Sequence, residues 1–388
     1  MPNFERRAFL KTGGALALTG MIGRPALAST PNHRSLETEI TDKAIRFSGD
    51  GLSLTPADYA RLLSLLTADD SFEHDGYGNG GIIGVLEQKF AHLLGKETAV
   101  FLPTGTMANH LAVRRLTGSR ERVIVQADSH LYNDSGDCVQ ELSGLNLVPI
   151  EGEFSPEAIK SVLGRSASGR VKTEVGAIVL ESPLRRGFNT TQSLDQMAAI
   201  ADLAREEGVG LHLDGARLAM QAAHQGIAIA EYAANFDTVS MSLYKNFNAT
   251  GGAVLAGPRE MLDGLYHDRR MFGGSPYQVW PMASVALLFV EDFIAEYRKA
   301  KAVTDQLVNL LGDDSRFRFE MIPGGSNSFW MHLDGADPEA FVEGLAARHI
   351  HLISPRPQWD GLLMMINPTI GRRTAEELAG DFLATMEG

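Results

Sequence analysis

Cysteine is almost missing from this sequence, and so is any excess of positive charge. The 388 residues include one cysteine, Cys138, which excludes an internal disulfide framework and a metal site built from cysteines alone. The net charge at pH 7 is −13, so nucleic acids and anionic membranes are poorly suited as partners. The composition therefore directs attention to small-molecule ligands.

Three further absences narrow the class of protein. The sequence has no internal repeat and no low-complexity tract, and its histidines show no spacing typical of metal ligands, so we predict no metal site. What is present is a chain that is 44% hydrophobic and 21% charged. This composition suits a globular protein with a large core, divided into one large and one small domain.

The first 28 residues have the pattern of an export signal. Residues 6–11 read RRAFLK and form a basic leader, residues 12–23 form a short, mildly apolar run, and residues 26–28 are a small-x-small cleavage site. The leader resembles the twin-arginine type, although Glu5 stands where Ser or Thr is usual. A membrane anchor is the alternative, but the run is far shorter than the roughly 20 residues that span a bilayer. We predict an exported, periplasmic protein that has no membrane contact after cleavage, with residues 29–45 as a polar linker.

The rest of the chain alternates short apolar runs with amphipathic stretches. Ser193 and Gln196 form a capping box at the start of one predicted helix, and Gly208 is its stop signal. The predicted strands cover residues 98–102, 123–126, 175–180, 210–213, 238–242 and 253–256. Such alternation indicates an α/β fold with a mostly parallel sheet covered by helices, in which ligands bind beyond the carboxyl ends of the strands.

A Thr-Gly-Thr turn follows the first of these strands. Gly105 lets a ligand approach the backbone, and Thr104 and Thr106 offer hydroxyl groups. The helix that follows directs free N–H groups and the positive end of its dipole to the same place. The pattern is typical of a phosphate-binding turn, with an ordinary helix start as the alternative.

A histidine lies beyond the end of the second predicted strand. His130 stands between Asp128 and Asp134, where an imidazole can stack on a flat ring or transfer protons near neutral pH. Capping a helix or bonding a loop is the alternative role.

Two charged residues end other strands. Asp214 directly follows an apolar strand, and a buried carboxylate needs a cation or several hydrogen-bond donors. A protonated heterocycle nitrogen would satisfy it, and an internal ion pair with Arg217 is the alternative. Lys245 stands just past another apolar run, where loss of hydration lowers the pKa of an amine and makes it nucleophilic. An amine, a carboxylate, a phosphate turn and a ring-stacking histidine are the parts that hold pyridoxal 5'-phosphate.

These motifs together resemble the L-threonine aldolase branch of the β-eliminating lyase family, within the fold-type I pyridoxal-phosphate enzymes. The resemblance runs from about residue 46 to residue 274 and continues more weakly to the C-terminus. Its most specific part is HLDGARL at residues 212–218 followed by SLYKNF at residues 242–247. The other matching motifs are YGNGG (77–81), FLPTGTMAN (101–109), DSHLY (128–132), LES (180–182) and RRMFGG (269–274).

The resemblance implies a domain plan and a set of cofactor contacts. It implies a large pyridoxal-phosphate-binding domain in residues 46–279, with the fold of a fold-type I transferase, and a smaller C-terminal α+β domain in residues 280–388. Gly105 and Thr106 would grip the phosphate, His130 would stack on the ring, Asp214 would face the ring nitrogen, and Lys245 would form the Schiff base.

The resemblance also implies substrate contacts, with one departure. Arg217 would reach the phenolic oxygen or the substrate carboxylate, and Ser48 would lie near that carboxylate. The C-terminal arginine that usually holds the carboxylate is missing, because residues 363 and 364 are Leu and Met. Arg185, Arg186 and Arg356 are the candidates to replace it, and the sequence does not choose among them.

Two more departures lie close to the predicted chemistry. Leu184 replaces a histidine that is often credited with a role at the β-hydroxyl of the substrate. Tyr244 stands where serine is more common, beside Lys245, and is a candidate acid or base. The predicted catalytic residues are therefore Lys245, His130, Asp214 and Tyr244.

Three functions remain open at the level of the sequence. The first is aldol cleavage of a threonine-like β-hydroxy-α-amino acid to glycine and an aldehyde, and the second is β-elimination or racemisation of an amino acid. The third is an exported protein that binds the cofactor or an amino acid with little turnover. The family works as dimers or tetramers with sites at subunit interfaces, so a homodimer or homotetramer is expected.

Overall fold

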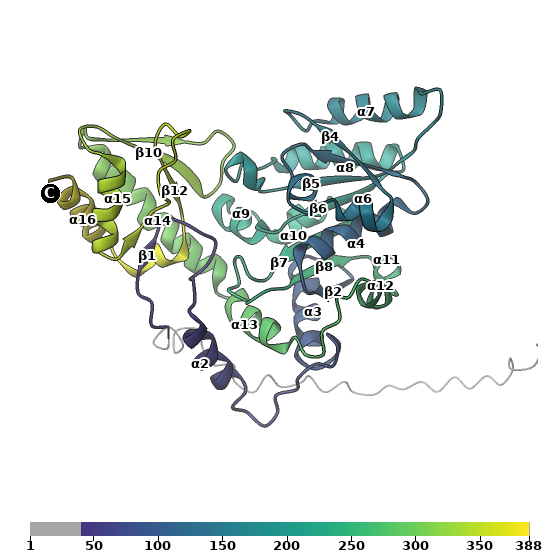
Figure 1. Ribbon diagram of the computed structural model, residues 1–388, viewed down its shortest axis with the longest axis horizontal. Helices are drawn as coiled ribbons and strands as arrows, with labels where there is room; N and C mark the ends of the chain where they lie inside the picture. The colour runs from purple at the N-terminus through teal and green to yellow at the C-terminus, as the bar shows by residue number, and fades with distance from the viewer. Residues whose placement is uncertain (1–39, 388) are drawn as a thin grey trace, which may run out of the picture.

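The computed structural model describes residues 40–387, which form two lobes (Figure 1). The export signal predicted over residues 1–28 and most of the predicted linker lie outside the described residues. Among the described residues, no helix is both long and apolar enough to cross a membrane.

A seven-stranded sheet forms the centre of the larger lobe, in the order β2-β8-β7-β6-β5-β3-β4. The strands are β2 (Thr98–Leu102), β3 (Arg122–Gln126), β4 (Asn146–Ile150), β5 (Val175–Glu181), β6 (Gly210–Asp214), β7 (Thr238–Ser242) and β8 (Ala253–Gly257). Strands β3 to β7 pair in parallel, which confirms the predicted mostly parallel sheet. Strand β4 was not predicted, and β8 is antiparallel to β2 and β7 because the link from β7 is too short for a crossover.

Helices cover both faces of this sheet, and the side-chain alternation of β5 shows why. Ile178 and Leu180 of β5 join the core beneath α8, while Ala177 and Val179 face the core beneath α4. The helices of this lobe are α2 (Pro56–Leu66), α3 (Gly81–Leu93), α4 (Gly105–Thr117), α5 (His130–Asn133), α6 (Cys138–Ser143), α7 (Pro156–Ser168), α8 (Leu194–Glu206), α9 (Leu218–Gln225), α10 (Ile229–Ala233), α11 (Arg259–Leu262), α12 (Leu265–Met271) and α13 (Trp280–Val290). The capping box predicted at Ser193 and Gln196 is confirmed at the start of α8.

Glycines in the sheet bring α4 unusually close to it. A Cβ built on Gly176 of β5 would lie 2.6 Å from Cα of Thr117, and one on Gly210 of β6 would lie 2.7 Å from Cδ2 of Leu116. The C-terminal end of α4 therefore rests directly on two strands. This contact fixes the position of the whole helix, including its first residue, Gly105.

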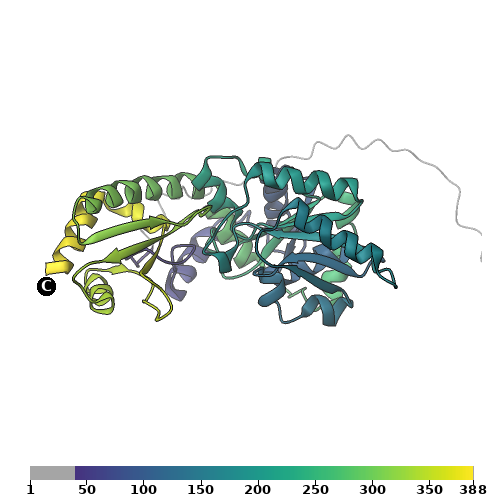
Figure 2. The same cartoon turned by 90° about the horizontal axis from the view of Figure 1, so that it is seen from above.

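The C-terminal lobe combines a small antiparallel sheet with helices, as predicted. Its strands are β9 (Phe317–Met321), β10 (Ser328–Leu333) and β12 (Leu362–Met365), in the order β12-β10-β9. Its helices are α14 (Phe293–Gly312), α15 (Pro338–Ala347), α16 (Ala375–Glu387) and the 3₁₀ helix η3 (Pro368–Arg372). Figure 2 shows the long helix α14 lying across one side of this sheet.

The first described residues also belong to this lobe. Strand β1 (Ile45–Arg46) pairs in parallel with β11 (Ile350–His351), and Ile40 and Ile45 are buried. Helix α13, by contrast, packs against α3 and α2 of the larger lobe. The predicted domain boundaries stay predictions, but these contacts show that the described part of the chain, residues 40–387, begins and ends in the same lobe.

Candidate active site

A cavity of about 330 Å³ opens at the carboxyl ends of β6 and β7. Asp214 is the last residue of β6, Lys245 follows β7, and both side chains line this cavity. The turn between β2 and α4 and the first residue of α5 form other parts of its wall. Six of the predicted site residues line it, namely Gly105, Thr106, His130, Asp214, Tyr244 and Lys245.

Asp214 is held by hydrogen-bond donors rather than by a cation. Nδ2 of Asn109 donates to Oδ2 of Asp214 at 2.5 Å, and the N–H of Ala216 donates to Oδ1 at 3.2 Å. The amide oxygen of Asn109 accepts from Oγ of Ser240 (2.7 Å) and lies 3.0 Å from Nε2 of His212, so its NH₂ group faces Asp214. The carboxylate forms no ion pair within residues 40–387, and the alternative pairing with Arg217 is not formed.

Lys245 is likewise without a hydrogen bond or ion pair in the described part of the chain. Burial lowers the pKa of its amine, and the nearby Arg217 cation lowers it further, against the opposing effect of Asp214 and Asp50. Its Nζ lies 5.6 Å from the ring centroid of Tyr244. A larger fraction of the amine is therefore neutral and able to act as a nucleophile.

The turn before α4 leaves free backbone donors at the cavity. Thr104 is the N-cap of α4, and its Oγ1 accepts the N–H of Met107 at 3.1 Å. The N–H groups of Gly105 and Thr106 belong to the first turn, where no helical carbonyl accepts them. They are available, with the helix dipole, to an anion such as a phosphate group.

His130 is oriented by a carboxylate that the sequence analysis did not single out. The backbone N–H of His130 donates to Oε2 of Glu181 at 2.5 Å. Oε1 of Glu181 accepts the backbone N–H of Arg185 at 3.0 Å. Burial, and then the neighbouring Asp214, raise the pKa of Glu181 to about 7. Glu181 is the last residue of a fully buried strand. The same signal identified Asp214 in the sequence, and it would have identified Glu181 as well.

The imidazole of His130 is kept neutral by its surroundings. Burial lowers its pKa, and the nearby Lys245 and Arg185 cations act in the same direction, against Asp214 and Asp134. A neutral ring with a free lone pair can stack on a flat ligand and accept a proton.

Arg217 is paired with Asp50, which the sequence analysis also missed. Nε of Arg217 donates to Oδ1 of Asp50 at 2.7 Å, and Nη2 donates to Oδ2 at 2.9 Å. This bidentate pair is buried for the most part. Arg217 does not line the cavity itself, although its charge acts on Lys245.

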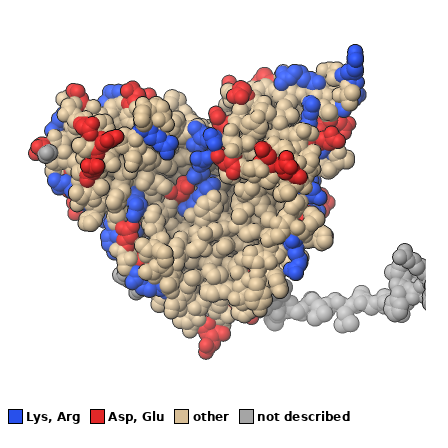
Figure 3. All heavy atoms as spheres, in the orientation of Figure 1, with Lys and Arg blue, Asp and Glu red and all other residues tan. Residues whose placement is uncertain are grey.

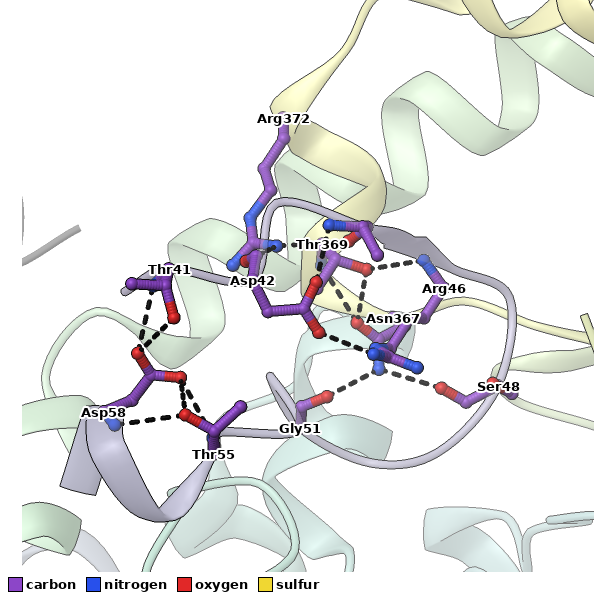
Figure 4. Close-up of polar contacts among 11 residues, drawn as sticks. Thr41, Asp42, Arg46, Ser48, Gly51, Thr55, Asp58, Asn367, Thr369 and Arg372 are labelled. Carbon is purple, nitrogen blue, oxygen red and sulfur yellow. Dashed lines mark hydrogen bonds and ion pairs between the residues drawn. The ribbon is translucent and has the colours of Figure 1, made fainter. Parts of the chain in front are cut away.

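The segment around Asp50 is fixed from the C-terminal lobe (Figure 4). Nδ2 of Asn367 donates to the carbonyl oxygens of Ser48 (3.0 Å) and Gly51 (2.9 Å). Its Oδ1 accepts from the N–H and Oγ1 of Thr369, whose Oγ1 in turn accepts the N–H of Arg46. Asn367 is fully buried, so it positions the backbone on both sides of Asp50.

The remaining predicted substrate contacts lie away from the cavity wall. Ser48 is half-buried, and Arg185 and Arg186 both bind Asp134. Arg356 is exposed, and its guanidinium lies 4.6 Å from the ring centroid of Trp359. The cavity therefore contains the predicted cofactor contacts other than Arg217, and the predicted substrate arginines lie outside it.

Comparisons with known proteins identify the family of the chain. A family model described as beta-eliminating lyase matches residues 63–315. The chain is 29% identical to the low specificity L-threonine aldolase of Saccharomyces cerevisiae over 280 residues, which are 70% of this chain and 71% of the yeast protein. It is 30% identical to the aldolase vrtJ of Penicillium aethiopicum over 236 residues, which are 60% of this chain and 59% of the fungal protein.

Solved structures resemble the fold over most of its length. A threonine aldolase of Leishmania major has a TM-score of 0.67 at 19% identity, covering 88% of this chain and 99% of that one. A serine palmitoyltransferase of S. paucimobilis was solved with a bound pyridoxal-phosphate adduct. It has a TM-score of 0.63 at 17% identity, covering 89% of this chain and 87% of that one.

Proposed function

Because the chain belongs to the beta-eliminating lyase family, we propose that it cleaves the Cα–Cβ bond of a threonine-like β-hydroxy-α-amino acid, releasing glycine and an aldehyde. The observation that carries this proposal is the shared cavity of Lys245 and Asp214. An amine and a carboxylate at the ends of neighbouring strands, neither in an ion pair with another described residue, face the same space beside a helix N-terminus.

The residues present fit pyridoxal phosphate, on which the family depends, and the fold is that of the fold-type I enzymes. The ring nitrogen would face Asp214, the phosphate would meet the N–H groups of Gly105 and Thr106, His130 would stack on the ring, and Lys245 would attach the cofactor. The bound cofactor supplies an electron sink for the pair released when a bond to Cα breaks.

The protein side chains supply charge and proton transfer. The donors from Asn109 and Ala216 fix the carboxylate of Asp214 at the cavity, where it would meet a protonated ring nitrogen. Lys245 holds or releases a proton at Nζ because its pKa is lowered. Nδ1 of His130 is turned toward Asp134, 3.8 Å from Oδ2, so Nε2 is the ring nitrogen left to accept the β-hydroxyl proton.

Covalent labelling tests the role of Lys245 directly. After borohydride reduction of the purified protein, peptide mass spectrometry is expected to find a pyridoxyl group on Lys245. Lys96 is an internal control, because burial lowers its pKa as well, yet it lies outside the cavity with Nζ on the carbonyl of Phe236. The variant Lys245→Ala is expected to lose activity by about a thousandfold or more.

The products identify the reaction. Incubation with threonine is expected to yield acetaldehyde and glycine, which supports aldol cleavage. Release of ammonia with a 2-oxo acid would instead favour elimination, and absence of a pyridoxyl group on Lys245 would exclude both reactions.

A further inference from the structure

Two arginines bind one carboxylate immediately beyond His130. Nη2 of Arg185 lies 2.5 Å from Oδ2 of Asp134, and Arg186 contacts the same carboxylate through Nε (3.2 Å) and Nη2 (2.7 Å). We call Asp134, Arg185 and Arg186 the Asp134–arginine cluster. Asp134 follows the short helix α5 that starts with His130, so the cluster borders the residue that lines the cavity.

The loop that carries these arginines is held at several points. Its ends are joined by the bond from the N–H of Leu184 to the carbonyl of Thr190 at 2.7 Å. Phe188 packs edge-on against Trp330 of β10, with ring centroids 5.3 Å apart, and Asn189 donates to Oδ1 of Asn327 at 2.9 Å. The loop therefore spans the two lobes in a defined conformation, which lowers the entropic cost of binding a ligand.

The cluster has guanidinium donors and positive charge that Asp134 does not occupy. Arg185 uses one guanidinium nitrogen and Arg186 uses two, which leaves three guanidinium nitrogens without a hydrogen bond to any described residue. The two side chains remain 45% and 43% exposed, and the cluster has a net charge of +1. Figure 3 shows Lys and Arg side chains in the hollow between the lobes, although the chain as a whole carries −13.

We propose that the Asp134–arginine cluster binds a second anionic group, carried on the side chain of the substrate, so that acidic β-hydroxy-α-amino acids are preferred to neutral ones. This deepens the proposed function and rests on it. His130 accepts the β-hydroxyl proton, so the substituent on Cβ lies near His130, and an anion on that substituent meets the guanidinium groups beyond it. Asp134 holds the two arginines in place without neutralising both of them.

Chemical balance is satisfied for the simplest such substrate, 3-hydroxyaspartate. Its Cα–Cβ bond breaks, the β-hydroxyl proton leaves to His130, and Cα gains a proton. The products are glycine and glyoxylate, so no oxidant or other reactant is required.

A comparison of three substrates separates the effect of side-chain charge from that of side-chain size. We would measure kcat/KM of the holoenzyme for 3-hydroxyaspartate, the neutral and similarly sized 3-hydroxyasparagine, and threonine. The acidic substrate is expected to exceed its amide by about tenfold or more, because it gains charge-assisted hydrogen bonds. In Arg186→Met this ratio is expected to fall toward one, and Arg186→Lys is expected to retain part of it.

A control variant and a binding measurement complete the test. Arg205→Met removes an exposed arginine that pairs with Asp202 on α8, and it is expected to leave the ratio unchanged. Calorimetry should show that L-aspartate binds more tightly than L-asparagine, and that Arg186→Met removes the difference. Equal kcat/KM for the acid and its amide, or an equal loss for both in Arg186→Met, would overturn the inference while leaving threonine cleavage intact. Failure to cleave any of the three substrates would count against the proposed function, whereas an aspartate preference that depends on Arg186 would still support the anion site.

Discussion

Burial decides the charge of the ionisable side chains around the cavity. It is the largest cause of the shifts in Lys245, His130 and Glu181, and it moves each of them toward its neutral form. Asp214 is held by Asn109, whose amide oxygen is already occupied. The site therefore places one carboxylate with fixed donors among groups that burial moves toward their neutral forms.

A second glutamate, Glu87, is half-buried away from the cavity and provides a measurable pH effect on stability. Oε1 of Glu87 accepts the N–H of Phe101 at 2.8 Å, and burial raises the pKa of Glu87 to about 7 from 4.5. Between these two pH values the folded chain binds more protons than the unfolded chain, so the free energy of unfolding falls as pH rises and levels off above about pH 7. Glu87→Gln keeps an acceptor for the N–H of Phe101 and removes the fall in the free energy of unfolding with rising pH.

Denaturant unfolding at pH 5 and pH 8 tests the effect. Relative to the wild type, Glu87→Gln is expected to gain up to about 3 kcal/mol between the two pH values. Stability curves of the two proteins that stay parallel from pH 5 to pH 8 would contradict the ionisation of a half-buried Glu87.

At the scale of elements, the contact between α4 and the sheet sets the position of the phosphate turn. Gly176→Ala would place a methyl group 2.6 Å from Cα of Thr117, a backbone atom that cannot rotate away. The expected cost is about 1–3 kcal/mol of stability, together with weaker cofactor binding because α4 shifts. Thermal unfolding and cofactor titration measure the two effects.

Helix α7 offers the matched control for this substitution. Gly164 lies within α7 and has open space around its missing Cβ. Gly164→Ala is expected to raise stability by about 0.5–1 kcal/mol, since alanine is the better helix former. If both glycine variants were equally stable, close packing of α4 would not be what Gly176 provides.

The sequence predicted the elements and residues whose signal is local. Asp214 and Lys245 stand at the ends of apolar runs, so their strands and their shared edge of the sheet followed from the order of residues. The partner of Arg217 could not be predicted, because Asp50 lies 167 residues away and nothing near it marks the pairing. The antiparallel direction of β8 could have been predicted, because the predicted strands 238–242 and 253–256 leave a link too short for a parallel crossover.

At the scale of the whole molecule, the lobes meet through the segment that precedes α2. Asn367 donates to carbonyl oxygens on both sides of Asp50, and Asp50 holds Arg217. The C-terminal lobe therefore sets the position of Arg217, an arginine of the larger lobe whose charge acts on Lys245. The export signal, the domain boundaries and the homodimer or homotetramer stay predictions from the sequence.

Removing the hydrogen bonds that Asn367 donates to Ser48 and Gly51 should affect both stability and substrate binding. Asn367→Ala leaves buried carbonyl oxygens without their donor, at a cost of about 1–3 kcal/mol. It also loosens the segment that carries Asp50, so KM is expected to rise more than kcat falls. Asn235→Ala, in the turn just after α10, is the control and should change neither quantity. A normal KM in a destabilised Asn367→Ala protein would show that the link serves folding alone.

The hydrogen bonds between the first and last parts of the described chain can form only late in synthesis. Arg46 and Thr369 are 323 positions apart, and Ser48 and Asn367 are 319 apart. Strands β2 to β8 are all translated before residue 258, so the central sheet emerges from the ribosome long before Asn367 does. A nascent chain thus contains the lysine and its carboxylate early, yet it acquires the fixed setting of Asp50 only when translation is almost finished.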